Sequence, residues 1–286
     1  MDLSIIIVSW NVKEKLKENL KAIYESQGNF SFEVFVIDNN SHDNSAEMVE
    51  KKFPEVKLIK NKENVGLSRA VNQVKDLISG DFVLLLNSDN KVQPNTFINM
   101  LDWMRANPNA GVATCKLIDQ NGETIKQIRR FPTLKDQLAI VLKLTHIFPN
   151  ILKDYIREDF DYEKPAKVDS VRGAFFMIRK NLIKKIGLWD PRYFIWFEEV
   201  DYCRETCEAG SEVWYTPVAE CVDYIGQSFN QVDMGTKQKY FSDSMLKYFK
   251  KWHPVWQYWV LKLVWPIIIF FAMILGKIGI KSRGKN

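Results

Sequence analysis

The sequence contains little cysteine and none of the short glycine-rich motifs that mark several large enzyme classes. Four cysteines in 286 residues are too few and too irregularly spaced for a disulfide framework. Cys203 and Cys207 lie four residues apart on a predicted helix, but no CxxC or HxxxH motif accompanies them, so structural thiols are favoured over a metal pair. The motifs GxGxxG, GxxxxGK with a following Ser or Thr, and GxSxG are absent, which argues against dinucleotide-dependent enzymes, phosphate-loop NTPases and serine hydrolases.

The chain also lacks the basic and apolar regions of a secretory signal peptide. Met1 and Asp2 lead directly into a short apolar segment, so the body of the protein is expected to stay in the cytoplasm. With 46% hydrophobic and 26% charged residues, the composition excludes disordered and fibrous classes. The length allows one large α/β domain with an appendage, or two small domains.

The positive charge is concentrated at one end of the chain. The formal net charge is +5, but residues 237–286 contain ten basic residues and one acid, a net +9, which leaves −4 for residues 1–236. The mildly acidic body argues against a nucleic-acid partner. The basic segment also holds four of the nine tryptophans, and this combination is typical of a surface that faces a membrane.

Strand-like and helix-like segments alternate along the first part of the chain. Short apolar runs predict buried strands, and apolar residues at helical spacing predict the helices between them. Such alternation predicts an α/β fold with a doubly wound sheet. The expected strands are 3–9, 33–38, 56–60, 81–86, 111–118, 173–178, 213–215 and 221–225, and the expected helices are 12–26, 45–53, 67–78, 94–107, 180–186 and 200–209.

Polar residues follow the predicted strands, at the edge where doubly wound sheets bind their ligands. Three acidic clusters stand out there: Asp38 with Asp43, Asp89, and a run from 198 to 201. Taken singly, each is explained by a helix cap, a strand end or a solvated helix start. Taken together, carboxylates gathered at one edge repel each other unless a cation or a reaction uses them.

An ordered series of motifs runs from residue 4 to residue 205: SIIIVSWN (4–11), IDNNSHDNS (37–45), NVGLSRAVN (64–72), LLLNSDN (84–90), GAFFMIRK (173–180) and GLWDPRYFIWFEEVDYCRE (187–205). Each motif alone is weak, but the series resembles family 2 glycosyltransferases with the GT-A fold, especially their bacterial rhamnosyltransferase-like members. The expected fold is therefore a GT-A-type doubly wound mixed sheet with a C-terminal amphipathic, membrane-associated helical segment.

The resemblance implies an inverting transfer of a sugar from a nucleotide diphosphate sugar. Departure of the diphosphate requires positive charge, which Mg²⁺ or Mn²⁺ held by oxygen ligands supplies. Asp89 matches the last carboxylate of the family's Asp-x-Asp metal motif, with Asn87 at the first position. Asp38 matches the carboxylate that accepts a hydrogen bond from the pyrimidine, and Arg69 either meets the diphosphate or is a solvated helix residue. The residues expected to bind the nucleotide sugar are Ser9, Trp10, Asn11, Asp38, Asn64, Gly66, Arg69, Asn87 and Ser88.

Inversion by a single displacement requires one base to take the proton of the acceptor hydroxyl. The family pattern assigns that position to Glu199, where Asp is usual, with Glu198 as the competing assignment. Asp201, in the same expected catalytic group, either starts the helix or contacts the acceptor. Trp196 and Arg204 are expected to bind the acceptor, and the aromatics around residue 196 either serve the site or belong to the core.

Asp223 also departs from the family pattern, because the family often has His at this position. It either joins Asp89 as a metal ligand or has a structural role. The departures at Asn87, Glu199 and Asp223 leave open an alternative, a non-catalytic nucleotide-sugar-binding or scaffold subunit tethered to the membrane.

We expect residues 1–236 to form the glycosyltransferase domain, with a nucleotide-sugar-binding half at 1–118 and an acceptor-binding half at 119–236. Residues 132–165 mix an apolar helix-like stretch with charged residues and are expected to form an insertion or lid. The apolar run at 263–276 is fourteen residues long, short of the roughly 20 that a full span needs.

Basic residues flank the apolar part of the tail on both sides. Residues 237–286 are therefore expected to form a peripheral or monotopic anchor at the cytoplasmic face of the cell membrane, with a core helix and a true span as alternatives. A membrane location makes a polyprenyl-diphosphate-linked glycan of the cell envelope the expected acceptor, with dTDP-rhamnose as a candidate donor.

Overall fold

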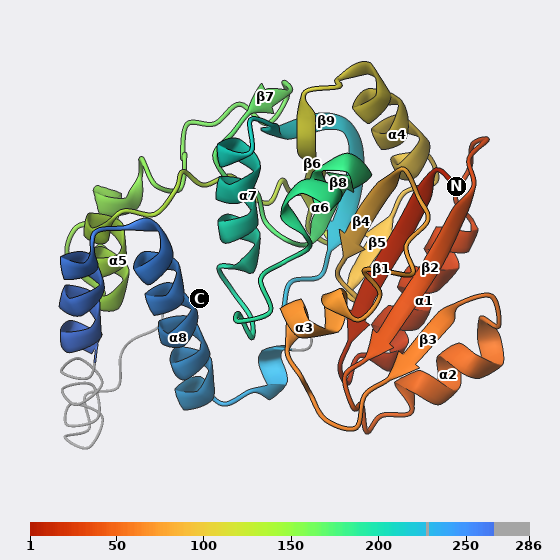
Figure 1. The fold of residues 1–286 in the computed structure, drawn as a ribbon, viewed down its shortest axis with the longest axis horizontal. Coiled ribbons are helices and arrows are strands. Elements are labelled where there is room, and N and C mark those ends of the chain that lie inside the picture. Colours follow the sequence, from red (N-terminus) through yellow and green to blue (C-terminus); the bar gives the residue numbers. More distant parts are fainter. Residues whose placement is uncertain (227–228, 266–286) are drawn as a thin grey trace.

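The computed structural model describes residues 1–226 and 229–265 and is built around one mixed sheet (Figure 1). Its strands follow each other in the order β3-β2-β1-β4-β8-β6-β9-β5, and β7 pairs with β9. The mixed α/β architecture predicted from the sequence is confirmed. The strands are β1 Leu3–Ser9, β2 Phe32–Asp38, β3 Lys57–Lys60, β4 Phe82–Leu86, β5 Asn90–Val92, β6 Ala110–Ile118, β7 Ala166–Lys167, β8 Phe175–Arg179 and β9 Glu212–Asp223.

The first four strands of this order are parallel, which brings their carboxyl ends to one edge of the sheet. Ser9 at the end of β1 pairs with Asp38 at the end of β2, and β4 lies on the other side of β1. β8 then runs antiparallel to both β4 and β6. The polar residues that follow β1, β2 and β4 are therefore neighbours in space although they are far apart in the sequence.

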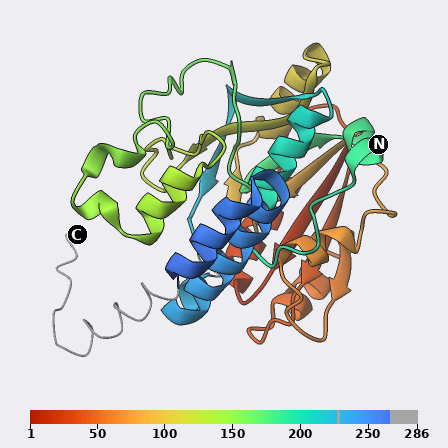
Figure 2. The ribbon, with the colours of Figure 1, turned by 60° about the vertical axis from the view of Figure 1, so that its left-hand side comes forward.

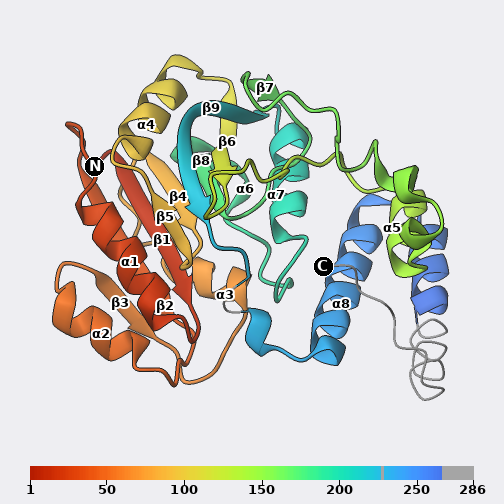
Figure 3. The ribbon, with the colours of Figure 1, turned by 180° about the vertical axis from the view of Figure 1, so that it is seen from behind.

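Helices cover both faces of the sheet (Figures 1 and 3). Side chains alternate along the central strand, so that Ile5 and Ile7 of β1 join one core while Ile6 joins the other. This two-sided burial explains why the strand segments are continuously apolar. The first core is covered by α1 Lys13–Tyr24, α2 Ser45–Lys52 and α4 Thr96–Ala106, and the second by α3 Leu67–Asn72, α6 Lys180–Ile186 and α7 Glu198–Glu208.

The structure corrects several predicted boundaries. The helix predicted at 67–78 ends at Asn72, and the helix predicted at 200–209 begins at Glu198, so the two adjacent glutamates lie in its first turn. The strands predicted at 213–215 and 221–225 are parts of the single strand β9. Pro217 lies within β9 where the pairing register between β6 and β9 shifts, so that no regular ladder hydrogen bond is needed there. The short strand β5 was not predicted.

The insertion and the C-terminal region pack together at one side of the molecule (Figures 1 and 2). Val141 of the insertion, Phe197 before α7, and Tyr248 and Leu261 near the C-terminus belong to one buried apolar cluster. The elements are α5 Leu134–Val141, the 3₁₀ turns Leu144–His146, Pro149–Leu152 and Phe229–Gln231, α8 Met234–Trp252, and helical residues 255–265.

Part of the predicted tail is thus a packed helix, and α8 crosses the predicted domain boundary at residue 236. That boundary remains a prediction. Among the helices of the described residues, none is long and apolar enough to cross a membrane. Most of the apolar run at 263–276 and the last basic residues lie outside the described residues.

Candidate active site

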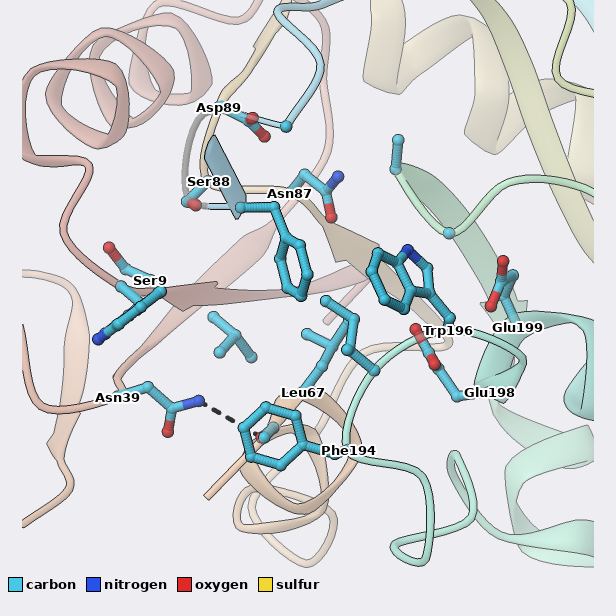
Figure 4. Close-up of a pocket in the computed structure, with 18 of the residues that line it drawn as sticks. Ser9, Asn39, Leu67, Asn87, Ser88, Asp89, Phe194, Trp196, Glu198 and Glu199 are labelled. Atoms are coloured by element: carbon cyan, nitrogen blue, oxygen red, sulfur yellow. Dashed lines mark hydrogen bonds between the residues drawn. The ribbon is translucent and has the colours of Figure 1, made fainter. Parts of the chain in front are cut away.

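A cavity of about 370 Å³ opens at the carboxyl ends of β1, β2 and β4, where polar residues meet the start of α7 (Figure 4). Strand-end residues such as Ser9 and Asp89 lie on one side, and Glu198 and Glu199 lie on the other. The cavity is lined by Val8, Ser9, Trp10, Asn39, Asn64, Gly66, Leu67, Asn87, Ser88, Asp89, Arg172, Gly173, Ala174, Phe194, Ile195, Trp196, Glu198, Glu199, Ile225, Gly226 and Phe229.

The strand-end side combines preformed backbone geometry with polar groups that have spare hydrogen-bonding capacity. The Asn64 side-chain oxygen accepts from the Gly66 amide at 3.0 Å, and the Asn39 amide donates to the Gly66 carbonyl at 3.3 Å. The buried Ser9 hydroxyl has no partner among the described residues. Because unpaired buried polar groups are costly, Ser9 is suited to a polar ligand in the cavity.

Gly66 brings the two halves of the site into direct contact. Its φ is +84°, and a Cβ atom built there would lie 2.7 Å from Phe194 Cδ2 and 2.8 Å from the Phe194 carbonyl oxygen. The next residue, Leu67, donates its amide proton to that same carbonyl at 2.7 Å. Glycine is needed here because no side chain fits between α3 and the segment before α7.

Three expected donor-binding residues do not line the cavity. Asp38 is buried just behind it and accepts a hydrogen bond from the Ser41 amide at 2.9 Å, while its other oxygen has no partner among the described residues. Asn11 is turned into the loop after β2, where its side chain accepts from the His42 amide. Arg69 is exposed on α3 and donates to the Pro191 carbonyl at 3.2 Å.

The two acids expected to hold a metal lie on neighbouring segments. Asn90 pairs with Asp223 in the β5–β9 ladder, and the Tyr224 amide donates to the carbonyl of Asp89 at 3.3 Å. One Asp223 oxygen accepts from the Ile225 amide, and the buried second oxygen lies 3.2 Å from Arg172 Nη1, within ion-pair distance but not aligned as a hydrogen bond.

The carboxylates of Asp89 and Asp223 are of the chemical type that a hard divalent cation prefers, but two such side chains are too few to hold the ion alone. Carboxylate oxygens are the ligands that Mg²⁺ and Mn²⁺ prefer. The described residues contain no group of three or more His, Cys, Asp or Glu side chains that would hold a metal. Oxygen ligands from a bound diphosphate would have to complete the coordination.

A sharp turn in the backbone presents the two glutamates to the cavity. Trp196 and Phe197 both have left-handed conformations, with φ of 65° and 67°, immediately before α7 begins. This conformation is unfavourable for aromatic residues and persists only where the surrounding packing enforces it. It directs the first turn of α7 at the cavity, and the amide groups of a helix N-terminus favour nearby carboxylates.

The two neighbouring carboxyls have different electrostatic surroundings. Burial raises the pKa of Glu198 well above its ordinary value, and the charges of Glu199 and Asp201 raise it further. Burial also raises the pKa of Glu199, but backbone hydrogen bonds and the Arg172 guanidinium oppose that rise. The Arg172 guanidinium therefore favours the ionised form of Glu199, whereas the neighbouring negative charges favour the neutral form of Glu198.

The other residues expected on the acceptor side separate into two groups. Trp196 lines the cavity with Phe194. Asp201 does not reach it: the buried carboxylate accepts from Lys251 Nζ at 2.7 Å and from the Trp252 indole at 2.5 Å. Arg204 also faces α8, with its guanidinium over the Trp252 ring. Asp201 and Arg204 therefore hold α7 against α8 in this structure.

Sequence reasoning missed several residues that line the cavity. Asn39 directly follows the singled-out Asp38, and Arg172 directly precedes the quoted motif that starts at Gly173. The signal available for Arg172 was a basic residue next to a strand otherwise made of apolar residues. Ile225 and Phe229 had no signal, because only the return of the chain after β9 brings them to the cavity.

Comparison with known proteins gives consistent results. The sequence profile described as Glycosyl transferase family 2 matches residues 4–187. The chain is similar to the N-acetylglucosaminyl-diphospho-decaprenol L-rhamnosyltransferase of Mycobacterium tuberculosis, with 25% identity over 208 residues, which are 68% of this chain and 67% of the relative. It is also similar to the poly-beta-1,6-N-acetyl-D-glucosamine synthase of Staphylococcus aureus, with 21% identity over 225 residues, 77% of this chain but 49% of that relative.

Among solved structures, the fold is similar to that of a mannosyltransferase from Pyrobaculum calidifontis in complex with GDP-Man and Mn²⁺. The TM-score is 0.58 at 16% identity, and the match covers 99% of this chain and 76% of the other. At this identity the similarity establishes the fold alone.

Proposed function

Since the chain belongs to glycosyltransferase family 2, we propose that it transfers a sugar, with inversion, from a nucleotide diphosphate sugar to a hydroxyl of a lipid-linked cell-envelope glycan. One observation carries the proposal. A single cavity is lined on one side by the polar ends of parallel strands and on the other by two carboxyls with raised pKa values. Perturbed acids in the main cavity of an α/β fold are the expected features of an active site.

The donor would bind along the strand-end side of the cavity. Ser9, Asn39 and Asn64 offer hydroxyl and amide groups for the nucleoside and sugar. Asp38 lies next to this side with one unpaired oxygen, suited to a pyrimidine N–H. Mg²⁺ or Mn²⁺ held by Asp89, with Asp223 and the donor diphosphate as further ligands, would neutralise charge on the departing diphosphate.

Glu199 is the base in this proposal. Its carboxylate takes the proton of the acceptor hydroxyl while the hydroxyl oxygen forms a bond to the anomeric carbon. The bond from that carbon to the diphosphate breaks on the opposite face, and its electron pair leaves with the diphosphate. Burial and the neighbouring charges favour the neutral form of Glu198, which then adds no second negative charge beside the base.

Two features support an acceptor at the membrane. The mycobacterial relative is named for a decaprenol-diphosphate-linked acceptor. Several large apolar side chains are exposed at the C-terminal side of this chain, among them Trp256 and Trp259, with Lys262 beside the Trp259 ring. Exposed tryptophan and lysine together favour a membrane interface, so we infer a peripheral position at the cytoplasmic face of the cell membrane.

The test is a donor and acceptor screen with the purified full chain. dTDP-rhamnose, UDP-N-acetylglucosamine and GDP-mannose are each supplied with Mg²⁺ or Mn²⁺ and a prenyl-diphosphate-linked N-acetylglucosamine acceptor. Release of the nucleotide diphosphate, dependent on both acceptor and metal, is the expected result. Binding of a nucleotide sugar without turnover on any acceptor would instead support a non-catalytic binding subunit.

A further inference from the structure

Arg172 places a positive charge in the cavity between two acids. Among the described residues that line the cavity, Arg172 alone has a basic side chain. Its Nη1 lies 3.2 Å from Asp223 Oδ2, and its charge also favours the ionised form of Glu199. A guanidinium has five N–H donors, so this single ion pair leaves most of them available to another anion.

Arg129 lies near Arg172 although 43 positions separate them in the sequence. Arg129 and Ser170 form an isolated antiparallel bridge, with amide-to-carbonyl distances of 3.2 and 3.1 Å. Arg172 follows Ser170 by two residues. In antiparallel pairs, long side chains reach a diagonal neighbour at this offset. In agreement with this proximity, burial lowers the pKa of Arg129 and the charge of Arg172 contributes to the same shift.

Arg129 has no acidic partner among the described residues. Its Nη1 donates only to the carbonyl oxygens of Lys126 at 3.0 Å and Ile128 at 2.8 Å. The adjacent Arg130, by contrast, forms an ion pair with the buried Asp136 at 2.7 Å. Two neighbouring guanidiniums, one of them half-buried and without a counter-charge, are unfavourable unless an anion binds there.

The insertion contributes a neutral hydrogen-bond donor to the same region. The Arg130 amide donates to the Tyr155 carbonyl at 3.1 Å, which fixes this part of the insertion beside Arg129. Burial raises the pKa of Tyr155 to about 12, and its phenol is influenced by the charges of both Arg129 and Glu199. The hydroxyl is therefore protonated at neutral pH, and the backbone hydrogen bond to Arg130 holds this residue of the insertion next to Arg129.

We propose that Arg129, Arg172 and the Tyr155 hydroxyl form a diphosphate-binding subsite on the acceptor side of Glu199. Guanidinium groups bind phosphate oxygens through paired, charge-assisted hydrogen bonds. Because the insertion supplies Tyr155 and the strand ends that face the donor lie across the cavity, the diphosphate assigned to this subsite is that of a lipid-linked acceptor. This inference rests on the proposed function.

The subsite would also select the length of the acceptor. A diphosphate held beside Glu199 brings the sugar that is directly attached to it within reach of the base. The favoured acceptor is then a diphosphate-linked monosaccharide or a very short glycan. A neutral growing polymer has no group for the two arginines.

The test compares two acceptors with the full chain. One is N-acetylglucosamine linked through a diphosphate to a short prenyl chain, and the other is the same sugar as a prenyl glycoside without the diphosphate. Loss of one charged hydrogen-bonding group costs about 1.5–3 kcal/mol, so Arg129→Gln should raise the KM for the first acceptor about 10- to 100-fold. The kcat, the KM for the glycoside and the donor Kd by calorimetry should change less than about twofold.

Lys126→Gln is the matched control, because it removes the same charge from an exposed side chain three positions away. It should leave both KM values unchanged. Weaker donor binding in Arg129→Gln with an unchanged acceptor KM would assign the arginines to the donor diphosphate and overturn the proposal. An equal rise in the KM for both acceptors would also overturn the proposal, since a general structural role of Arg129 predicts that result.

A binding measurement separates the subsite from the reaction. Inorganic pyrophosphate is titrated into protein already saturated with dTDP or UDP. The wild type and Lys126→Gln should bind it, and Arg129→Gln should bind it at least about tenfold more weakly. Failure of the wild type to bind would overturn the subsite even if glycosyl transfer is found. Binding without any transfer would overturn the proposed function alone.

Discussion

Glu198 and Glu199 are consecutive in the chain and lie in the same cavity, yet their surroundings favour different protonation states. Glu198 is buried and is affected by the negative charges of two neighbouring acids. Glu199 has the Arg172 guanidinium nearby, which favours its charged form. Environments that separate two carboxyls in this way commonly produce one ionised and one protonated group with distinct chemical roles.

Replacing the base should abolish turnover without affecting the donor site. Glu199→Gln removes the proton acceptor and should lower kcat by about 10²- to 10⁴-fold. Glu198→Gln replaces a neutral acid with a neutral amide of similar shape and should lower kcat by less than about tenfold. Steady-state kinetics and donor calorimetry on both variants check this. The opposite ranking would assign the base to Glu198.

The same pair predicts how stability depends on pH. The pKa of Glu198 in the folded state is raised above that of the unfolded chain by burial and neighbouring negative charges. Its contribution to stability is therefore complete below the unfolded-state pKa and is lost as the pH rises through the folded-state pKa. Glu198→Gln cannot ionise. Its Tm should therefore exceed that of the wild type by an amount that grows with pH, about 2–4 °C for each ~1 kcal/mol.

Thermal unfolding between pH 4 and pH 9 gives the comparison, with Glu47→Gln, an exposed acid on α2, as the control. A constant Tm difference across that range would mean that Glu198 does not carry a raised pKa.

At the scale of elements, the start of α3 depends on a close approach to the segment before α7. Gly66→Ala should destabilise the fold by about 1–3 kcal/mol, because the new methyl group adds a clash with Phe194 to the strain of a positive φ. Gly122→Ala is the matched control, since Gly122 has φ of +83° but nothing within 4 Å of the added atom. Urea unfolding should give the larger loss for Gly66→Ala. Equal losses would show that the contact with Phe194 contributes nothing.

The pairing of α7 with α8 is a second relation between elements. Lys251 Nζ lies 2.7 Å from Asp201 and 2.6 Å from Glu205, and the Asp201 side chain is only 1% exposed. Lys251→Met leaves that buried carboxylate without its cation. Since Lys251 itself is partly exposed, we expect the free energy of unfolding to fall by about 2 kcal/mol, which is less than for a fully buried pair.

Lys250→Met controls for the charge, because Lys250 is the adjacent, exposed residue of α8 and has no ion pair among the described residues. Its free energy of unfolding should stay within about 0.5 kcal/mol of the wild type. If both variants unfold at the same urea concentration, Lys251 does not hold α8 on α7.

At the scale of the whole molecule, exposed apolar side chains from two distant parts of the chain occur on elements that pack together. Val141 of α5 and Leu261 share one buried cluster. The exposed large apolar residues that follow α5 or lie among residues 255–265 are Leu142, Ile147, Phe148, Val255, Trp256, Trp259 and Leu263. Exposed apolar side chains beside basic residues, such as Trp259 with Lys262, favour contact with anionic lipid.

Vesicle flotation tests that surface. The full chain should float with vesicles that contain phosphatidylglycerol and less with pure phosphatidylcholine, and the double variant Ile147→Asp/Phe148→Asp should reduce the bound fraction several-fold. Leu77→Asp, at another exposed apolar residue, should not. Unchanged flotation of the double variant would show that the insertion takes no part in membrane binding.

Much of the α/β core was predictable because local pattern determines it. Ile5 and Ile6 lie in a continuous apolar run, which fits only a strand buried on both faces. Asp38 directly follows such a run, and Asp89 follows another after two polar residues. The placement of acids at the edge of the sheet follows from the parallel order of the strands. The extent of β9 was not predictable, because Pro217 breaks the pattern while a shift in pairing register accommodates it.

The sequence by itself determined the family, through the order of its motifs along the chain, and it determined the strand-end acids and the adjacent glutamates, because residues close together in the chain carry them. Only the tertiary structure assigned the partners of these groups. It directed Asp201 to Lys251 of α8, brought Arg172 to Asp223, and paired Arg129 with Ser170. These contacts join segments 40 or more positions apart, and local periodicity carries no information about which charges meet when such segments pack.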